Sequence, residues 1–283
     1  MKVFSVFSFF ILLASSSFAQ EAIDDFFAMY EEGEYEKVIK KMDDLIFDPG
    51  SYKIYKLKGD CHHKVEEFEQ AIENYNLAES FDKGNSELYV HRGAAFMGID
   101  NYEAALKDLN KAIKVDPKNA EAYYYKGLWN FDYHKLKQAI QSFDNAIQNK
   151  REYYEAHFMR AAAYAELKKW NQALSDYEIV QRINPDIEEA TYYAGMIYFD
   201  LENFESALME FEKVETEYNT SGEYYFFRGE AKYYLKDRQG ACADYKLAAG
   251  LGDSDSINVY QNYCLDNKDK GRFKRVRETK VNL

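Results

Sequence analysis

Apolar residues recur at helical spacing along most of this chain, and short polar turns interrupt them at regular intervals. In residues 86–119, one apolar stripe runs through places 1–14 of the segment and a second runs through about places 17–30. Apolar positions at i, i+3 and i+4 are typical of amphipathic helices. The pattern therefore predicts two helices joined by a short turn.

The same pattern returns every 34 residues. Small residues occupy place 8 of all six full segments (Gly59, Gly93, Gly127, Ala161, Gly195 and Gly229) and also place 20 (Ala71, Ala105, Ala139, Ala173, Ala207 and Ala241). A small residue where two helices cross lets their backbones approach. All three prolines lie at segment ends, where they stop the preceding helix. One helix pair cannot cover its own apolar face, so these segments are expected to stack.

The register of these places resembles the tetratricopeptide repeat (TPR) family: an aromatic near place 4, small residues at 8 and 20, aromatics at 11, 17 and 24, and proline at 32. The resemblance covers residues 20–255, as a shortened repeat at about 21–51 and full repeats at 52–85, 86–119, 120–153, 154–187, 188–221 and 222–255. It implies an all-α fold, a right-handed α-solenoid of about seven TPR helix pairs. Residues 256–265 are expected to form a capping helix.

Both ends of the chain differ from the repeats. Residues 1–19 combine Lys2, an uncharged run from Val3 to Leu13 and small residues at 17–19, which is typical of a secretory signal peptide. A membrane anchor is the alternative, but a spanning helix needs about 20 apolar residues. We therefore expect an extracytoplasmic protein, periplasmic or secreted. Residues 266–283 carry seven basic and three acidic residues and are expected to be a mobile basic tail.

The composition argues against several classes of function. A formal net charge of −13 disfavours nucleic acid as a partner, because phosphate backbones are bound by clustered Lys and Arg. No ordered set of Ser, His and Asp and no Gly-rich phosphate loop stands out, so we expect no enzyme, no catalytic residue and no cofactor.

The histidines do not indicate a metal site. Cys61, His62 and His63 are consecutive on a predicted helix and point about 100° apart, so they cannot converge on one ion. His62 occupies place 11, which is an aromatic core place in other repeats, and is expected to be a core histidine. His91, His134 and His157 are scattered over three repeats with no consistent partner.

Charged residues at places 7 and 23 vary together. In three repeats an arginine at place 7 is followed 16 residues later by an aspartate: Arg92 and Asp108, Arg160 and Asp176, Arg228 and Asp244. Where place 7 is Lys126 or Ala194, place 23 is Ser142 or Glu210. The covariation predicts a structural ion pair between the two helices of each of these repeats, of the kind that a guanidinium can make with two hydrogen bonds.

Two of the three cysteines are candidates for a disulfide. Cys242 lies in the second helix of the last repeat and Cys264 ends the predicted cap, 22 residues later. In an exported protein a disulfide between them is plausible, and TPR geometry implies that the cap packs against that helix. Two buried thiols are the alternative. Cys61 is expected to be unpaired.

In TPR proteins the first helices line a concave groove, and by resemblance places 2, 5, 9, 12 and 13 of this chain point into it. From the fourth unit on, which starts at residue 120, these places are rich in aromatic residues: Tyr124, Phe131, Phe158, Tyr192, Phe199, Phe226, Tyr233 and Tyr234. Place 2 carries an acidic row, Glu87, Glu121, Glu155, Glu189 and Glu223. Rings are typical binding anchors and carboxylates favour basic partners. Alternatively, part of this set packs against neighbouring repeats.

The resulting prediction is a protein–protein interaction scaffold or assembly adapter. Its groove would hold an extended or helical segment of a protein or peptide partner, basic and aromatic in character. One alternative is an envelope structural protein, attached to an anionic membrane or polymer through the basic tail. Another is that the tail folds back on the acidic body.

Overall fold

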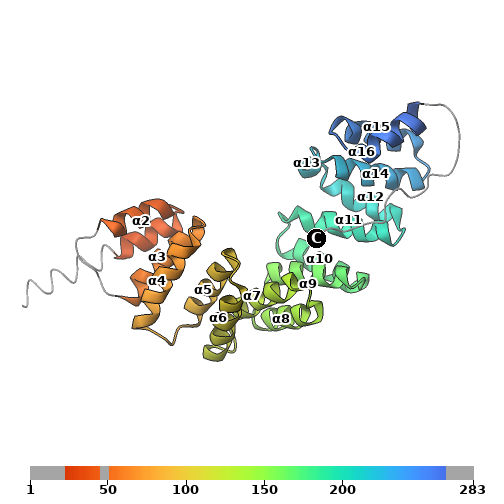
Figure 1. The fold of residues 1–283 in the computed structure, drawn as a ribbon. Helices are drawn as coiled ribbons and strands as arrows, with labels where there is room; N and C mark the ends of the chain where they lie inside the picture. The colour runs from red at the N-terminus through yellow and green to blue at the C-terminus, as the bar shows by residue number, and fades with distance from the viewer. Residues whose placement is uncertain (1–22, 45–50, 266–283) are drawn as a thin grey trace, which may run out of the picture. The chain divides into compact units, whose positions relative to one another are not determined.

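The computed structural model describes residues 23–44 and 51–265, and every element in these ranges is helical (Figure 1). The chain divides into two compact units, residues 1–133 and 134–283, and each is described by itself. The predicted signal peptide, the Asp48-Pro49-Gly50 end of the first repeat and the basic tail lie outside the described residues. The described elements form an all-α solenoid, which confirms the predicted fold class.

The N-terminal unit is a succession of helix pairs in which each helix packs on its neighbours in sequence. It contains a helix over residues 23–31 followed by α2 (Tyr35–Asp43), α3 (Tyr52–Lys64), α4 (Phe68–Phe81), α5 (Ser86–Gly98), α6 (Tyr102–Val115) and α7 (Ala120–Asp132). The first helices of successive pairs also meet, because α5 packs on α3 and α7. Their faces therefore form one continuous surface within this unit.

The C-terminal unit repeats the arrangement and ends in a cap. Its elements are α8 (Leu136–Asn149), α9 (Tyr154–Glu166), α10 (Trp170–Ile183), α11 (Glu188–Asp200), α12 (Phe204–Lys213), α13 (Glu215–Tyr218), α14 (Gly222–Tyr234), α15 (Arg238–Gly250), α16 (Ser254–Val259) and a π-helical turn, η1 (Tyr260–Leu265). The cap starts two residues earlier than expected. The Asp253 side chain accepts a hydrogen bond from the Ser256 amide and so fixes the start of α16 at Ser254.

Close packing explains the small residues at place 8. A Cβ atom added to Gly59 would lie 2.7 Å from the ring of Tyr75, and one added to Gly195 would lie 2.8 Å from the ring of Phe211. Tyr75 and Phe211 both occupy place 24 and are fully buried. Place 8 is small because the large side chain of the second helix lies directly on it.

The turn between the two helices of each repeat uses a left-handed residue that is not glycine. Place 15 has positive φ in all six full repeats: Glu66 (61°), Asp100 (58°), His134 (51°), Lys168 (56°), Glu202 (59°) and Lys236 (66°). In the turn after α5, the next amide, that of Asn101, donates to the Phe96 carbonyl at 2.8 Å and closes the helix end. An L-residue in this conformation costs about 1–2 kcal/mol. These turns therefore hold local strain.

None of the described helices combines the length and the apolar character needed to cross a membrane.

Candidate partner-binding surface

Two of the eight predicted groove rings are core residues. Phe199 is 3% exposed and Phe226 is 5% exposed, so these two assignments to an open surface are wrong. Phe199 lies between repeats, with ring centroids 5.4 Å from both Phe204 and Phe227. The following helix pair covers place 12 here, so this ring packs inside the stack.

The other predicted rings of the C-terminal unit are half-buried and contact other rings. Tyr192 stacks on Tyr218 with centroids 4.6 Å apart, and Tyr234 stacks on Phe204 at 4.3 Å. The partly exposed members of this set are Phe158, Tyr192, Tyr233 and Tyr234. In the N-terminal unit, Tyr124 and Phe131 are also half-buried, and Tyr124 lies edge-on to Tyr125 at 5.4 Å.

The acidic row at place 2 stays at the surface. Glu87, Glu189 and Glu223 are exposed, whereas Glu121 and Glu155 are half-buried. Burial raises the pKa of the Tyr193 hydroxyl, and the carboxylates of Glu189 and Glu223 raise it further. These two carboxylates thus make the first-helix face of the C-terminal unit electronegative.

The first helices of the N-terminal unit enclose a pocket of about 230 Å³. Its lining comes from the helix over residues 23–31 and from α3, α5 and α7, with one ring from α4. The side chains are mainly polar and aromatic: Tyr30, Asp60, His63, Lys64, Tyr75, His91, Ala94, Glu121 and Tyr125. Asp60, His63, Lys64, Ala94 and Glu121 occupy the groove places 9, 12, 13, 9 and 2 of their repeats. We call this cavity the first-helix pocket.

Asp60 is the centre of a hydrogen-bond network in this pocket. Its carboxylate accepts from Tyr75 Oη at 2.8 Å and lies 2.6 Å from His91 Nδ1, and Lys56 Nζ donates to it at 2.9 Å. On the other side of the imidazole, Nε2 lies 3.9 Å from Glu121 Oε2. The network therefore links α3, α5 and α7.

The network gives His91 a defined partner, although the sequence showed no consistent partner for the scattered histidines. Asp60 and His91 lie 31 residues apart, at place 9 of one repeat and place 6 of the next. Two neighbouring first helices bring these places together, and that cross-repeat spacing is the signal that could have found the pair. His157 is partnered as well, because its Nδ1 lies 2.9 Å from Asp176 Oδ1.

Electrostatics keep a negative charge in the first-helix pocket. Burial by itself would raise the pKa of Asp60, but the hydrogen bond and charge of His91, together with Lys56, outweigh it and hold the pKa below its ordinary value. Burial lowers the pKa of His63, and the charge of His91 adds to this effect. At neutral pH the pocket therefore holds the anionic carboxylate of Asp60 and the neutral imidazole of His63.

The arginine and aspartate side chains at places 7 and 23 meet in all three repeats. Each guanidinium donates from Nε and Nη2 to the two oxygens of one carboxylate. The distances are 2.6 and 3.0 Å for Arg92 and Asp108, 2.8 and 2.7 Å for Arg160 and Asp176, and 2.9 and 2.7 Å for Arg228 and Asp244. These pairs fix how the two helices of a repeat cross.

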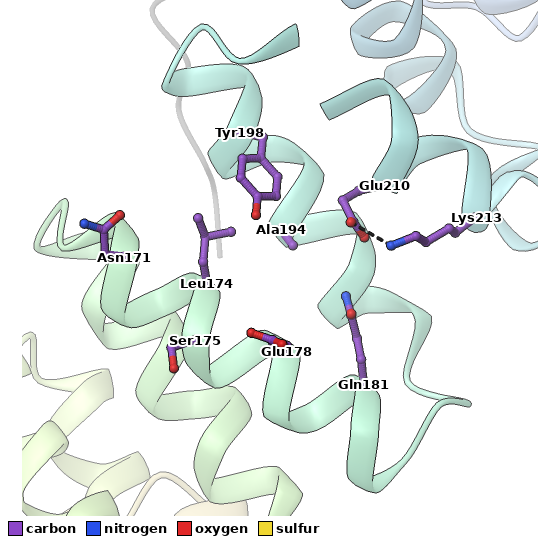
Figure 2. Close-up of a pocket in the computed structure, with 9 residues that line it drawn as sticks. All are labelled: Asn171, Leu174, Ser175, Glu178, Gln181, Ala194, Tyr198, Glu210 and Lys213. Atoms are coloured by element: carbon purple, nitrogen blue, oxygen red, sulfur yellow. Dashed lines mark hydrogen bonds and ion pairs between the residues drawn. The ribbon is translucent and has the colours of Figure 1, made fainter. Parts of the chain in front are cut away.

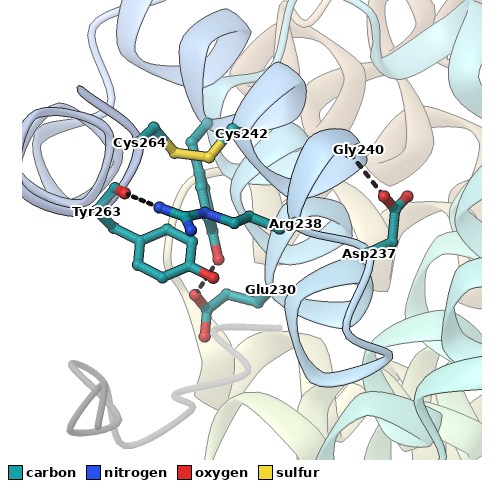
Figure 3. Close-up of a disulfide and its surroundings, with 8 residues drawn as sticks. Glu230, Asp237, Arg238, Gly240, Cys242, Tyr263 and Cys264 are labelled. Atoms are coloured by element: carbon teal, nitrogen blue, oxygen red, sulfur yellow. Dashed lines mark hydrogen bonds between the residues drawn. A yellow bond between two sulfur atoms is a disulfide. The ribbon is translucent and has the colours of Figure 1, made fainter. Parts of the chain in front are cut away.

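A disulfide joins the cap to the last repeat (Figure 3). The Cys242 and Cys264 sulfurs are 2.04 Å apart, and the link ties α15 to η1. Beside it, Arg238 Nη2 donates to the Tyr263 carbonyl at 3.2 Å. The cap is therefore held both covalently and by polar contacts.

Residues 61–63 have no arrangement typical of a metal site. Cys61 is a buried free thiol, and burial raises its pKa to about 12. His62 is buried, with Nδ1 2.7 Å from Glu67 Oε2. Within residues 23–44 and 51–265, no three His, Cys, Asp or Glu side chains are placed to hold a metal ion.

Comparison with protein families identifies the repeats. One family model described as TPR repeat matches residues 99–132, and another described as tetratricopeptide repeat matches residues 131–186 and 158–222. The chain is a tetratricopeptide-repeat protein. No curated protein matches this TPR chain.

Solved structures share the fold of this TPR protein at low sequence identity. PilF of Pseudomonas aeruginosa superposes with a TM-score of 0.66 at 16% identity, covering 74% of this chain and 96% of its own. The C-terminal part of a TPR repeat-containing protein from Cytophaga hutchinsonii gives 0.64 at 18% identity, covering 83% and 98%. A tetratricopeptide repeat protein from Parabacteroides merdae gives 0.56 at 20%, covering 86% and 97%.

Proposed function

We propose that this TPR protein is an interaction scaffold that holds a segment of a partner polypeptide against its first helices, with the first-helix pocket as the main anchor site. TPR folds are typically non-enzymatic protein-interaction scaffolds. The observation that carries the proposal is the pocket itself, because successive first helices contribute Asp60, His63 and Glu121 to it from groove places. A pocket built by several stacked repeats is suited to a side chain presented by an extended or helical segment.

The chemistry of the pocket favours a basic and aromatic partner segment. The carboxylates of Asp60 and Glu121 would attract a cation, and the half-buried rings of Tyr30 and Tyr125 offer flat apolar surface for a second side chain. The formal net charge of −13 would steer a basic segment toward the chain as it approaches.

An extracytoplasmic location is part of the proposal. Disulfides persist in oxidising compartments, and the bond between Cys242 and Cys264 supports such a location. The signal-peptide pattern in residues 1–19 supports the same location.

Site-directed crosslinking in the native cells would test the proposal. A photoreactive residue replaces Glu121 at the mouth of the first-helix pocket, and in a control chain it replaces Lys107, an exposed residue of α6. We expect a discrete protein adduct from position 121 and none from position 107. Equal labelling of background proteins from both positions would contradict the proposal.

The partner identified in this way then allows a binding measurement. Ala94→Trp fills the pocket, and the matched control Ala243→Trp places the same ring on an exposed site of α15. Calorimetric titration of the full chain should show at least a tenfold loss of affinity for Ala94→Trp, and also for Glu121→Lys if the partner is basic. Unchanged affinity in both pocket variants would exclude the first-helix pocket as the anchor.

A further inference from the structure

Place 7 carries a cation in five of the six full repeats. The residues are Lys58, Arg92, Lys126, Arg160 and Arg228, and the exception is Ala194. Each cation reaches a side-chain oxygen of the preceding repeat, on its second helix in four cases and on α13 in the case of Arg228. Lys58 contacts Asp43, Arg92 contacts Asn76 at 2.7 Å and Glu79 at 2.6 Å, Lys126 contacts Asn110 at 2.8 Å, Arg160 contacts Asp144 at 2.5 Å, and Arg228 contacts Glu215 at 3.0 Å.

The three arginines use their remaining donors within their own repeat, where they pair with the aspartate at place 23. Each guanidinium therefore lies among three helices: its own first helix, the second helix of its repeat and a helix of the repeat before, which is the second helix for Arg92 and Arg160 and α13 for Arg228. Arg92 and Arg228 are nearly inaccessible there, at 7% and 5% exposure. The space between three helices is thus shaped and charged for a planar cation.

In the repeat at 188–221, the corresponding space is an open pocket. It measures about 510 Å³ and is lined by side chains of α10, α11 and α12 (Figure 2). Ala194 lies at its base where the other repeats have a cation. We call this cavity the Ala194 pocket.

The acceptors for a cation are nevertheless retained in the Ala194 pocket. Glu178 occupies place 25, as Asn76, Asn110 and Asp144 do in their repeats, and Glu210 occupies place 23, where the arginine-containing repeats have aspartate. Figure 2 shows the two carboxylates on α10 and α12, which flank the pocket. Position 194 therefore provides no donor, although an acceptor is present on each side of it.

Glu210 supplies an independent indication that something binds here. One of its oxygens, Oε1, accepts from Lys213 Nζ at 2.7 Å. The other oxygen, Oε2, is buried and has no hydrogen-bond partner within the described part of the chain. A buried carboxylate oxygen without a donor is costly, so a donor that enters the pocket would be bound favourably.

We propose that the Ala194 pocket binds the guanidinium group of an arginine side chain supplied from outside this repeat. The planar group would donate to Glu210 Oε2 and to Glu178, at the same two places where Arg92 and Arg160 find their acceptors. The pocket is separate from the first-helix pocket and takes most of its lining from second helices. This proposal therefore stands independently of the function proposed above.

Two sources could present such a group. The first is the chain itself, since Arg272, Arg275 and Arg277 follow the last described residue of the same unit by at most 12 positions, a reach of up to about 40 Å of extended chain. A tethered arginine would also benefit from a high effective concentration. The second source is an arginine on another polypeptide.

Titration of the full-length chain with N-acetyl-arginine methylamide tests the proposal and separates the sources. NMR chemical shifts of α10–α12 residues are followed in wild type and in the triple variant R272Q/R275Q/R277Q. Binding by wild type with a Kd of about 1 mM would assign the pocket to an external arginine. Binding that emerges only in the triple variant would assign it to the tail.

Three controls define failure. The uncharged N-acetyl-citrulline methylamide should not bind, and Glu210→Gln should weaken arginine binding at least tenfold. Ala194→Arg should abolish binding, since it places a guanidinium inside the pocket. The proposal is overturned if neither wild type nor the triple variant binds the arginine probe, or if Ala194→Arg binds it as well as its parent chain does.

A thermal measurement gives a second, ligand-free readout. Ala194→Arg should raise the Tm of the C-terminal unit above that of Ala194→Met, which fills similar space without charge. A lower Tm for Ala194→Arg than for Ala194→Met would show that the pocket does not accept a guanidinium.

Discussion

Groove place 12 has different surroundings in α3 of the N-terminal unit and in α11 of the C-terminal unit. In the N-terminal unit places 9, 12 and 2 carry Asp60, His63 and Glu121, which surround an open pocket. In the C-terminal unit place 12 carries Phe199, which is buried between repeats. His63 is half-buried at the edge of the pocket, whereas the apolar ring of Phe199 is packed between repeats. At place 12 of these two repeats, the polar side chain thus lines a cavity and the aromatic ring stabilises the stack.

The largest expected difference in stability comes from replacing the residue at place 12 by alanine, once in each unit. Phe199→Ala should lower the free energy of unfolding of the C-terminal unit by about 3–5 kcal/mol, because it removes a fully packed ring. His63→Ala, at the same place in α3, should cost less than about 1 kcal/mol, since it lines a pocket. The chain has two tryptophans, Trp129 and Trp170, one in each unit, so fluorescence of single-tryptophan variants reports each unit separately. Equal losses of unfolding free energy in Phe199→Ala and His63→Ala would contradict the difference between the two units.

Reduction of the disulfide should affect only the C-terminal unit. The bond between Cys242 and Cys264 spans 22 residues, and a loop of this size stabilises by about 3 kcal/mol. Denaturant unfolding with and without reductant should show that loss in the Trp170 signal and no change in the Trp129 signal. The double variant C242S/C264S should be insensitive to reductant, and sensitivity in that variant would point to a different cause.

Asp60→Asn should make the N-terminal unit less stable in a pH-dependent way. The pKa of Asp60 is lowered in the folded chain, so its carboxylate stabilises the fold above the ordinary pKa of an aspartate, and this contribution is lost as the pH falls through the lowered value. The variant should be less stable by about 1–3 kcal/mol at pH 7. The difference from wild type should shrink below pH 4. A difference that stays constant down to pH 2 would show that charge is not the cause.

The smallest effect should be common to both units. Glu66→Gly in the N-terminal unit and Lys168→Gly in the C-terminal unit each remove the strain of a side chain on a left-handed backbone. The gain in stability should stay below about 1 kcal/mol, because glycine also gains conformational freedom in the unfolded chain. Gln172→Gly, inside α10, should instead cost about 1 kcal/mol. Destabilisation at positions 66 and 168 would mean that these side chains make contacts that outweigh the backbone strain.

The helices could be predicted because their signals are local and repeated. Each full repeat carries small residues at places 8 and 20, and the structure has the ring of Tyr75 on Gly59 and that of Phe211 on Gly195 for that reason. The contact between Arg160 and Asp176 also follows from a fixed spacing inside one repeat. Such contacts depend on two helices that are adjacent in sequence.

The candidate site depends on contacts between repeats, which a single repeat does not reveal. Whether Phe199 faces a partner or the core is decided by Phe204 and Phe227, the second of which belongs to the next repeat. Likewise, Asp60 and His91 are linked only when two first helices stack. Ala194 departs from the arginine pattern in the sequence, but the pocket beside it is visible only in three dimensions.

The cross-link between α15 and η1 determines how a mechanical load enters the molecule. Tension applied to the chain beyond Cys264 passes through the sulfur bridge directly to Cys242, so that residues 243–263 lie outside the path of the force. A force on this end of the chain would therefore act on the last full repeat and could not unfold the cap first. The disulfide-closed loop keeps the terminal segment from fraying and makes it a fixed point of attachment.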